Sequence, residues 1–196
     1  MENLEATNHH QHHLENLSFG FWIYLMTDLL MFAGLFAAYA VLKDSTWGGE
    51  GGKALFSLPF VLAETLILLT SSLTSGLATI GAQTNNKKQI LTWLFITFLL
   101  GLSFVSLELW EFRHLIAEGN SPDKSAFLSS FFGLVGTHGI HITVGLLWIL
   151  VLGITIWKRG LTDHIKNQLA RFSLFWHFLD IVWIFIFTFV YLIGKI

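Results

Sequence analysis

Pairs of ionisable side chains, spaced three residues apart, recur in three apolar stretches of the sequence. The pairs are Glu108 with Glu111, His138 with His141, and His177 with Asp180. Residues three apart share one face of a helix, so both members of each pair would project to the same side. Histidine nitrogens and carboxylate oxygens ligate metals and haem and relay protons. The same groups also hydrogen-bond one helix to another, which is the commoner role of buried polar groups.

The spacing limits the metal and haem hypotheses. A haem held by two histidines needs ligands on opposing sides of its pocket, so His138 and His141 cannot be the axial pair, although either one with His177 could. All three pairs together would supply enough ligands for a di-iron site, but the HxxHH boxes of membrane desaturases are absent. Three hypotheses stay open: a haem or metal enzyme, a proton-coupled transporter, and a non-catalytic subunit packed through a polar seam. The residues favour the third, with histidines bonded to nearby carboxylates or carbonyls.

Two further acids, Asp28 and Glu64, stand alone in other apolar stretches. A central charge in a bilayer costs roughly 2.5–3.5 kcal/mol on insertion scales, so each acid should face protein or water. One hypothesis gives them an influence on proton uptake, as a relay or a reactive carboxyl. The other makes them neutral acids that hydrogen-bond across helices. The sequence leaves both open.

The composition indicates a membrane protein. The chain has 196 residues, of which 54% are hydrophobic and 12% charged, whereas a soluble domain carries about 25% charged residues. Several apolar runs exceed the ~20 residues that cross a bilayer as a helix. The formal net charge of −2 suggests no nucleic-acid partner. The sequence contains no cysteine, which excludes thiolate metal sites.

We therefore predict an all-α integral membrane bundle of five transmembrane helices. The predicted spans cover about residues 19–42, 56–82, 90–112, 127–157 and 172–193. Residues 1–18 are predicted to form a flexible tail rich in histidine, ahead of one transmembrane domain over residues 19–196. The tail's HHQHH run is typical of a solvated low-complexity segment more than of a metal site. In the fourth span, Gly136, Gly139 and Gly145 favour close contact between helices.

An odd number of spans puts the two termini on opposite sides of the membrane. The short loops on the N-terminal side carry the adjacent basic pairs Lys87–Lys88 and Lys158–Arg159. Basic residues concentrate in cytoplasmic loops. This pattern predicts a cytoplasmic N-terminus and a periplasmic C-terminus.

Motifs in four of the spans resemble subunit III of the haem–copper oxidases. The stretch GLSFVSLELWEF is similar to the family's G-x-x-F-x-x-x-Q-x-x-E-Y, with Gly101, Phe104 and Glu111 matching and Glu108 replacing the glutamine. GTHGIHITVG is similar to HGxHVxxG, and FWHFLDIVW to W-H-F-x-D-x-V-W. In the first span, Asp28 stands where cytochrome c oxidases typically have a carbodiimide-reactive glutamate, which puts that chemistry in doubt here.

The resemblance is strongest to the ubiquinol oxidases of the cytochrome o type, in which the large subunit carries the family's first two helices. It implies an accessory subunit without a redox centre, in a bacterial inner-membrane complex that oxidises ubiquinol, reduces oxygen to water and pumps protons. Haem and copper would belong to the large subunit I, which this chain would stabilise while binding phospholipid and supporting proton uptake. Five-span relatives also accompany nitric oxide reductases, which leaves that assignment as the alternative.

Overall fold

The computed structural model describes residues 2–47, 55 and 57–195, with side chains from Ser18 onward. Five of its helical segments are long and apolar enough to cross a membrane, and the described residues contain no β-strand. The five segments are Ser18–Leu42, Leu58–Gln83, Lys87–Ala117, Ala126–Arg159 and Asp163–Lys195. The predicted all-α membrane bundle of five spans is therefore confirmed.

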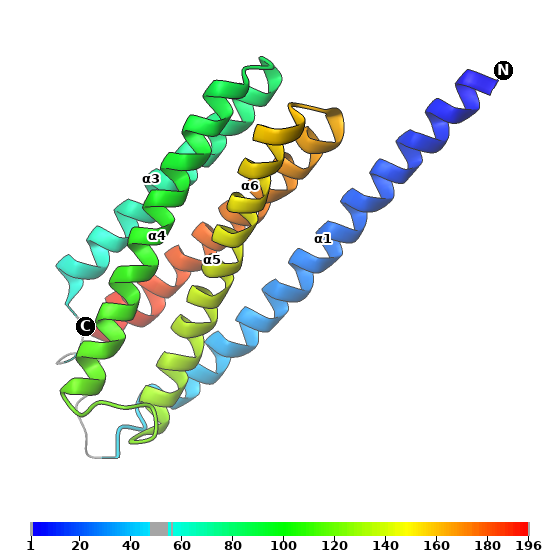
Figure 1. Ribbon diagram of the computed structural model, residues 1–196. Helices are drawn as coiled ribbons and strands as arrows, with labels where there is room; N and C mark the ends of the chain where they lie inside the picture. The colour runs from blue at the N-terminus through cyan, green and yellow to red at the C-terminus, as the bar shows by residue number, and fades with distance from the viewer. Residues whose placement is uncertain (1, 48–54, 56, 196) are drawn as a thin grey trace.

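The helices form a group of four with a fifth along one side (Figure 1). Their bounds are α1 Glu2–Leu42, α3 Leu58–Gln83, α4 Lys87–Ala117, α5 Ala126–Arg159 and α6 Asp163–Ile186. In the group of four, α3 packs against α4 and α6, and α5 packs against the same two helices. Helix α1 lies against α5 and α6. The arrangement makes α5 and α6 the central pair, since α5 contacts α1, α4 and α6, and α6 contacts α1, α3 and α5.

Two segments differ from the sequence prediction. Residues 2–17 continue α1 as helix, because the segment contains neither proline nor glycine to end it. The flexibility of the tail stays a prediction, and the side chains of its HHQHH run lie outside the described part. The last span begins at Asp163 rather than near Phe172 and passes through the π-helix η1, Phe187–Leu192, into α7, Ile193–Lys195. Hydropathy located the apolar part of this span but gave no sign of the π-helical turns.

Side-chain caps fix where three of the helices begin. Asn86 accepts a hydrogen bond from the Gln89 amide at 3.2 Å, and Ser125 accepts one from the Leu128 amide at 3.1 Å. Thr162 caps α6 in the same manner, at 3.4 Å. Each cap satisfies an amide that has no partner inside the helix and typically contributes about 1 kcal/mol. The caps explain why the helices extend into the polar sequence beyond the predicted spans.

The indole of Trp176 fills the space between three helices. It projects from α6 and is 1% exposed. A Cβ atom added at Gly101 of α4 would lie 2.9 Å from its Cη2 atom, and one added at Gly145 of α5 would lie 2.7 Å from its Cζ3 atom. Only glycine fits at these two positions without displacing the ring. Gly145 thus makes the close contact that the sequence predicted, whereas Gly136 has ordinary room around it.

The contact between Gly145 and Trp176 leads to a matched pair of substitutions on α5. We expect Gly145→Ala to lower the free energy of unfolding by about 1–3 kcal/mol, as overpacked cores do. Gly153→Ala is the control, because a Cβ atom there meets nothing within 4 Å. Loss of helical circular dichroism with denaturant in detergent measures both. Equal stabilities of the two variants would contradict the packing described.

Candidate functional site

The eight polar residues singled out from the sequence lie inside the bundle but do not form one continuous seam. Six are buried, and His141 and His177 are half-buried. They divide into three groups with different partners, and one histidine stands apart from all three. The groups are acids on α3 and α4, an aspartate–histidine contact between α1 and α5, and a serine–histidine–aspartate group between α3 and α6.

The first group consists of Glu64 on α3 with Glu108 and Glu111 on α4. The three carboxyl groups are close enough for Glu64 to interact electrostatically with the other two. The Tyr191 hydroxyl, in η1, donates a hydrogen bond of 2.9 Å to Oε2 of Glu111. Both oxygens of Glu64 are buried without a hydrogen-bond partner among the described residues. The acids thus face one another and a tyrosine, rather than the histidines beside which the sequence analysis expected them.

Glu108 also explains one of the glycines of α5. A Cβ atom at Gly139 would lie 2.6 Å from either carboxylate oxygen of Glu108. The glutamate therefore packs directly on the α5 backbone, and Gly139 provides the room. The same carboxyl group lines a surface cavity of about 480 Å³ between α4 and α5, together with Phe112 and Phe132.

The second group joins α1 to α5. His141 Nδ1 lies 2.8 Å from the Thr137 carbonyl oxygen one turn earlier, which requires the ring proton on Nδ1. Its other nitrogen, Nε2, lies 3.7 Å from Oδ2 of Asp28. That separation is too long for a hydrogen bond and leaves an electrostatic contact. The sequence suggested that Asp28 is isolated. The structure shows that it is not, because the packing of α1 on α5 brings it beside His141.

The third group joins α3 to α6. The Ser72 hydroxyl lies 2.5 Å from Nδ1 of His177. It also interacts with the carboxyl group of Asp180, one turn further along α6. His177 and Asp180 do share a face, as their spacing predicted. Sequence reasoning missed Ser72, because the run TSSLTS of α3 does not show by itself which hydroxyl group faces α6.

His138 behaves as an aromatic core residue. It is fully buried, and neither ring nitrogen has a hydrogen-bond partner among the described residues. Its ring stacks on Trp183 with centroids 5.2 Å apart and meets the edge of Phe104 at 5.9 Å. Offset-stacked and edge-on aromatic pairs of this kind contribute about 0.5–1.5 kcal/mol beyond their buried area.

Hydroxyl groups on α3 accept hydrogen bonds from two tryptophan indoles of α6. Trp176 Nε1 donates to the Ser71 hydroxyl at 2.9 Å, and Trp183 Nε1 donates to the Thr65 hydroxyl at 3.0 Å. These donors and acceptors are all buried, so without each bond a polar group would be left unsatisfied in the membrane interior. The sequence analysis did not identify this set. The helical spacing of small hydroxyl residues along α3 is the signal that would have found it.

Metal ligation finds no support in this geometry. Among the side chains that the structure describes, in residues 18–47, 55 and 57–195, no group of three or more histidine, aspartate or glutamate residues converges to hold a metal ion. His138 and His177 face different partners, a tryptophan ring and a serine hydroxyl. In the described part of the chain, these two histidines take part in aromatic packing and hydrogen bonding between helices.

Comparison with known proteins identifies the family. The family model described as cytochrome c oxidase subunit III matches residues 1–195. The chain belongs to the subunit III family of haem–copper oxidases. The resemblance inferred from the motifs is confirmed.

Three relatives from this family are similar over most of their length. The subunit 3 of the cytochrome bo(3) ubiquinol oxidase of Pseudomonas aeruginosa is 58% identical over 181 residues, which cover 92% of this chain and 87% of the relative. The protein of the same name from Pseudomonas putida is 52% identical over 177 residues, or 90% and 86% of the two chains. The quinol oxidase subunit 3 of Bacillus subtilis strain 168 is 46% identical over 175 residues, or 89% and 86%. These names favour an oxidase over a nitric oxide reductase.

The motifs that indicated subunit III fall on the interhelical contacts. Trp176, His177, Asp180 and Trp183 of the last motif all interact with hydroxyl groups of α3. Gly101 of the third-span motif provides the space for Trp176. In this subunit III, the signature residues therefore have direct structural partners inside the chain.

The bond between Tyr191 and Glu111 yields a test of the acidic group. We expect Tyr191→Phe to lower the free energy of unfolding by about 1–3 kcal/mol, because it leaves a buried carboxyl oxygen without its donor. Tyr39→Phe is the control, since that buried hydroxyl makes only a 3.4 Å bond to the Val190 carbonyl. Denaturant titration of both variants in detergent measures the difference. A larger loss for Tyr39→Phe would refute the assignment.

Proposed function

We propose that this chain is the accessory subunit III of a proton-pumping ubiquinol oxidase in a bacterial cytoplasmic (inner) membrane. The observation that carries the proposal is the 58% identity over 92% of the chain to a protein named as subunit 3 of a ubiquinol oxidase. The complex would oxidise ubiquinol and reduce oxygen to water. Its haem and copper would lie in the large subunit I, and this chain would hold no redox centre.

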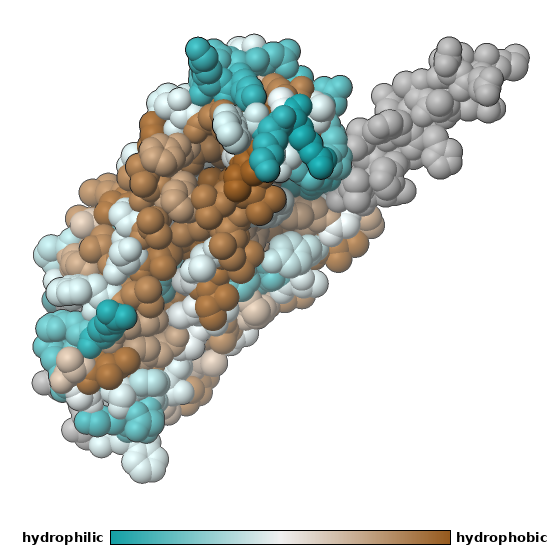
Figure 2. Space-filling model, viewed as in Figure 1, coloured by the Kyte–Doolittle hydropathy of each residue, from teal (hydrophilic) through white to brown (hydrophobic). Residues whose placement is uncertain are grey.

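The internal contacts support a stabilising role. Ionisable and hydroxyl side chains of the interior are directed at neighbouring helices, so their chemistry is used within the bundle. The face seen in Figure 2 has a broad apolar belt between polar ends. Large apolar side chains such as Leu66 and Leu73 on α3 are also exposed. We propose that part of this exposed apolar surface packs against the large subunit and that lipid covers the rest.

One groove suits the phospholipid that the family resemblance implies. It has a volume of about 540 Å³ and runs between α1 and the last span. Phe36, Phe185 and Phe189 line it, and Lys43 lies at one end. Apolar walls with a cation at the membrane surface fit acyl chains below a phosphate group.

The proposed orientation has the N-terminus in the cytoplasm and the C-terminus in the periplasm. The α3–α4 and α5–α6 turns lie at the same end of the bundle as the N-terminus (Figure 1). Lys87 and Lys88 begin α4 and Lys158 and Arg159 end α5, so basic pairs flank both short connections. Basic residues concentrate in this manner on the cytoplasmic side.

Copurification tests the proposed function. A tagged chain expressed in its own host should bring down a large subunit with a haem spectrum and a copper signal, and the preparation should oxidise ubiquinol with consumption of oxygen. Nitric oxide reduction without oxygen consumption would support the alternative assignment. Recovery of the chain without any haem protein would refute both.

We propose that Asp28, and to a smaller extent Glu64, influences proton uptake. Asp28 Oδ2 is buried without a hydrogen-bond partner among the described residues and lies beside His141, and an acid inside a transmembrane bundle is a functional candidate by default. We expect Asp28→Asn to leave initial oxygen consumption intact but to shorten the time over which turnover is sustained. Asp44→Asn is the charge-matched control, since Asp44 is exposed beyond the end of α1. Identical time courses for the two variants would remove this role.

A further inference from the structure

A groove lies between α4 and α5 on the outside of the bundle, and a buried acid takes part in its lining. Two cavities lie along this α4–α5 groove, one of about 480 Å³ and one of about 350 Å³. The first is lined by residues that include Glu108, Phe112, Gly133 and Ile140, and the second by residues that include Phe95 and Gly153.

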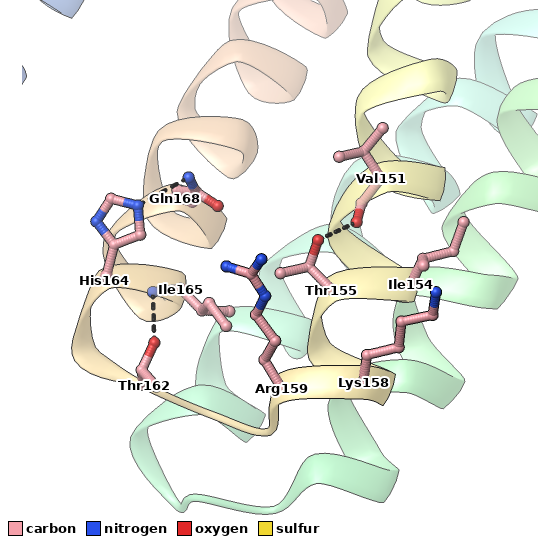
Figure 3. A pocket seen from close by; sticks show the side chains of 9 residues that line it. All are labelled: Val151, Ile154, Thr155, Lys158, Arg159, Thr162, His164, Ile165 and Gln168. Carbon is pink, nitrogen blue, oxygen red and sulfur yellow. Dashed lines mark hydrogen bonds between the residues drawn. The ribbon is translucent and has the colours of Figure 1, made fainter.

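The groove extends over most of the thickness of a membrane. On α4 the lining of the two cavities reaches from residue 91 to residue 112, which is about 30 Å along a helix. At one end, Ile154 lines both the second cavity and the pocket at the α5–α6 turn, where Lys158 stands (Figure 3). At the other end, Arg113 follows Phe112. Basic residues at both ends indicate that the groove has the length of a transmembrane helix.

Glycines of α5 line the groove without serving the packing inside the chain. A Cβ atom at Gly133 or Gly153 would meet nothing within 4 Å, whereas one at Gly139 would press on Glu108. Glycine lowers the stability of a helix relative to alanine, and inside this chain nothing at Gly133 or Gly153 offsets that loss. Small residues on an outer helix face allow the backbone of a second helix to approach closely.

Glu108 adds an unsatisfied polar group to this apolar surface. Its side chain is 3% exposed, and Oε1 has no hydrogen-bond partner among the described residues. Both carboxylate oxygens lie over Gly139, on the α5 side of the groove. The ionisable side chain that interacts with it is another acid, Glu111, which offers no compensating positive charge. A buried acceptor in this state requires a donor from elsewhere.

The requirement at Glu108 distinguishes the occupants that would fit the groove. Acyl chains fill apolar space but have no hydrogen-bond donor, so lipid tails would leave Oε1 unsatisfied. A helix that carries a hydroxyl, amide or indole group supplies such a donor, and polar side chains of this kind join helices in membranes. We propose that the α4–α5 groove receives a transmembrane helix of another subunit, which donates a hydrogen bond to Glu108. The proposal rests on the proposed function only in requiring a complex of several subunits.

Photo-crosslinking in the purified complex identifies the occupant. A benzophenone amino acid would replace Ile140 in the groove or, as the control, Leu73 on α3, since both side chains are 65% exposed. We expect position 140 to form an adduct with an apolar segment of another subunit that position 73 does not reach, as mapped by mass spectrometry. Adducts with lipid alone or with a second copy of this chain would overturn the proposal. A haem spectrum and oxygen consumption, measured first, keep this result separate from a wrong assignment of function.

Two substitutions of Glu108 test the hydrogen bond. Glu108→Met keeps the unbranched shape but removes the oxygen acceptors, whereas Glu108→Gln keeps one acceptor. We expect Glu108→Met to reduce retention of the crosslinked subunit in detergent about tenfold and Glu108→Gln to leave retention unchanged. The isolated chain should resist denaturant equally well in both variants, because Oε1 has no partner among its described residues. Equal retention in the two variants, or loss of stability of the isolated Met variant, would contradict the proposal.

A substitution that leaves the acid in place provides an independent test. Gly133→Leu narrows the groove, and the side chain has space in the isolated chain because a Cβ atom there meets nothing within 4 Å. It should release the same subunit, whereas Gly20→Leu on α1, where a Cβ atom is equally free, should not. If Glu108→Met fails to assemble, full retention in Gly133→Leu would by itself refute docking in the groove.

Discussion

The contact of Trp176 with two glycines is the constraint on which the bundle depends. The indole of α6 occupies space that Gly101 on α4 and Gly145 on α5 leave open, and its Nε1 proton goes to Ser71 on α3. One side chain thereby sets the distance between α6 and three neighbouring helices. Trp183 repeats the bond to α3 two turns further along, at Thr65. Since the interior of a membrane offers no hydrophobic drive between helices, close packing and such bonds have to hold them.

The packing of α6 around Trp176 also determines which partners the ionisable residues contact. With α6 locked against α3, the Ser72 hydroxyl reaches His177, and the ring of Trp183 covers His138. The packing of η1 brings Tyr191 to Glu111. Each polar group that resembled part of a metal site is thus directed at a neighbouring helix. This construction fits the structural role proposed for the chain within the oxidase.

The fold was predictable from sequence because the five apolar runs leave a chain no other way to cross a membrane. The shared face of His177 and Asp180 and the close contact at Gly145 followed from helical spacing. The partners of each residue on neighbouring helices did not follow from the spacing, because the rotation of one helix against another depends on the packing of every side chain between them. For that reason Asp28 and Glu64 seemed isolated, and the π-helical turns before Ile193 were missed.

The central claim is that these polar groups join helices and bind no redox centre. The most direct measurement is the haem, iron and copper content of the chain purified alone, set beside that of the intact complex. The account predicts a helical chain with no stoichiometric haem or metal, while the complex carries both. Stoichiometric haem or metal in the isolated chain, lost on replacement of His138 or His177 by alanine, would contradict it.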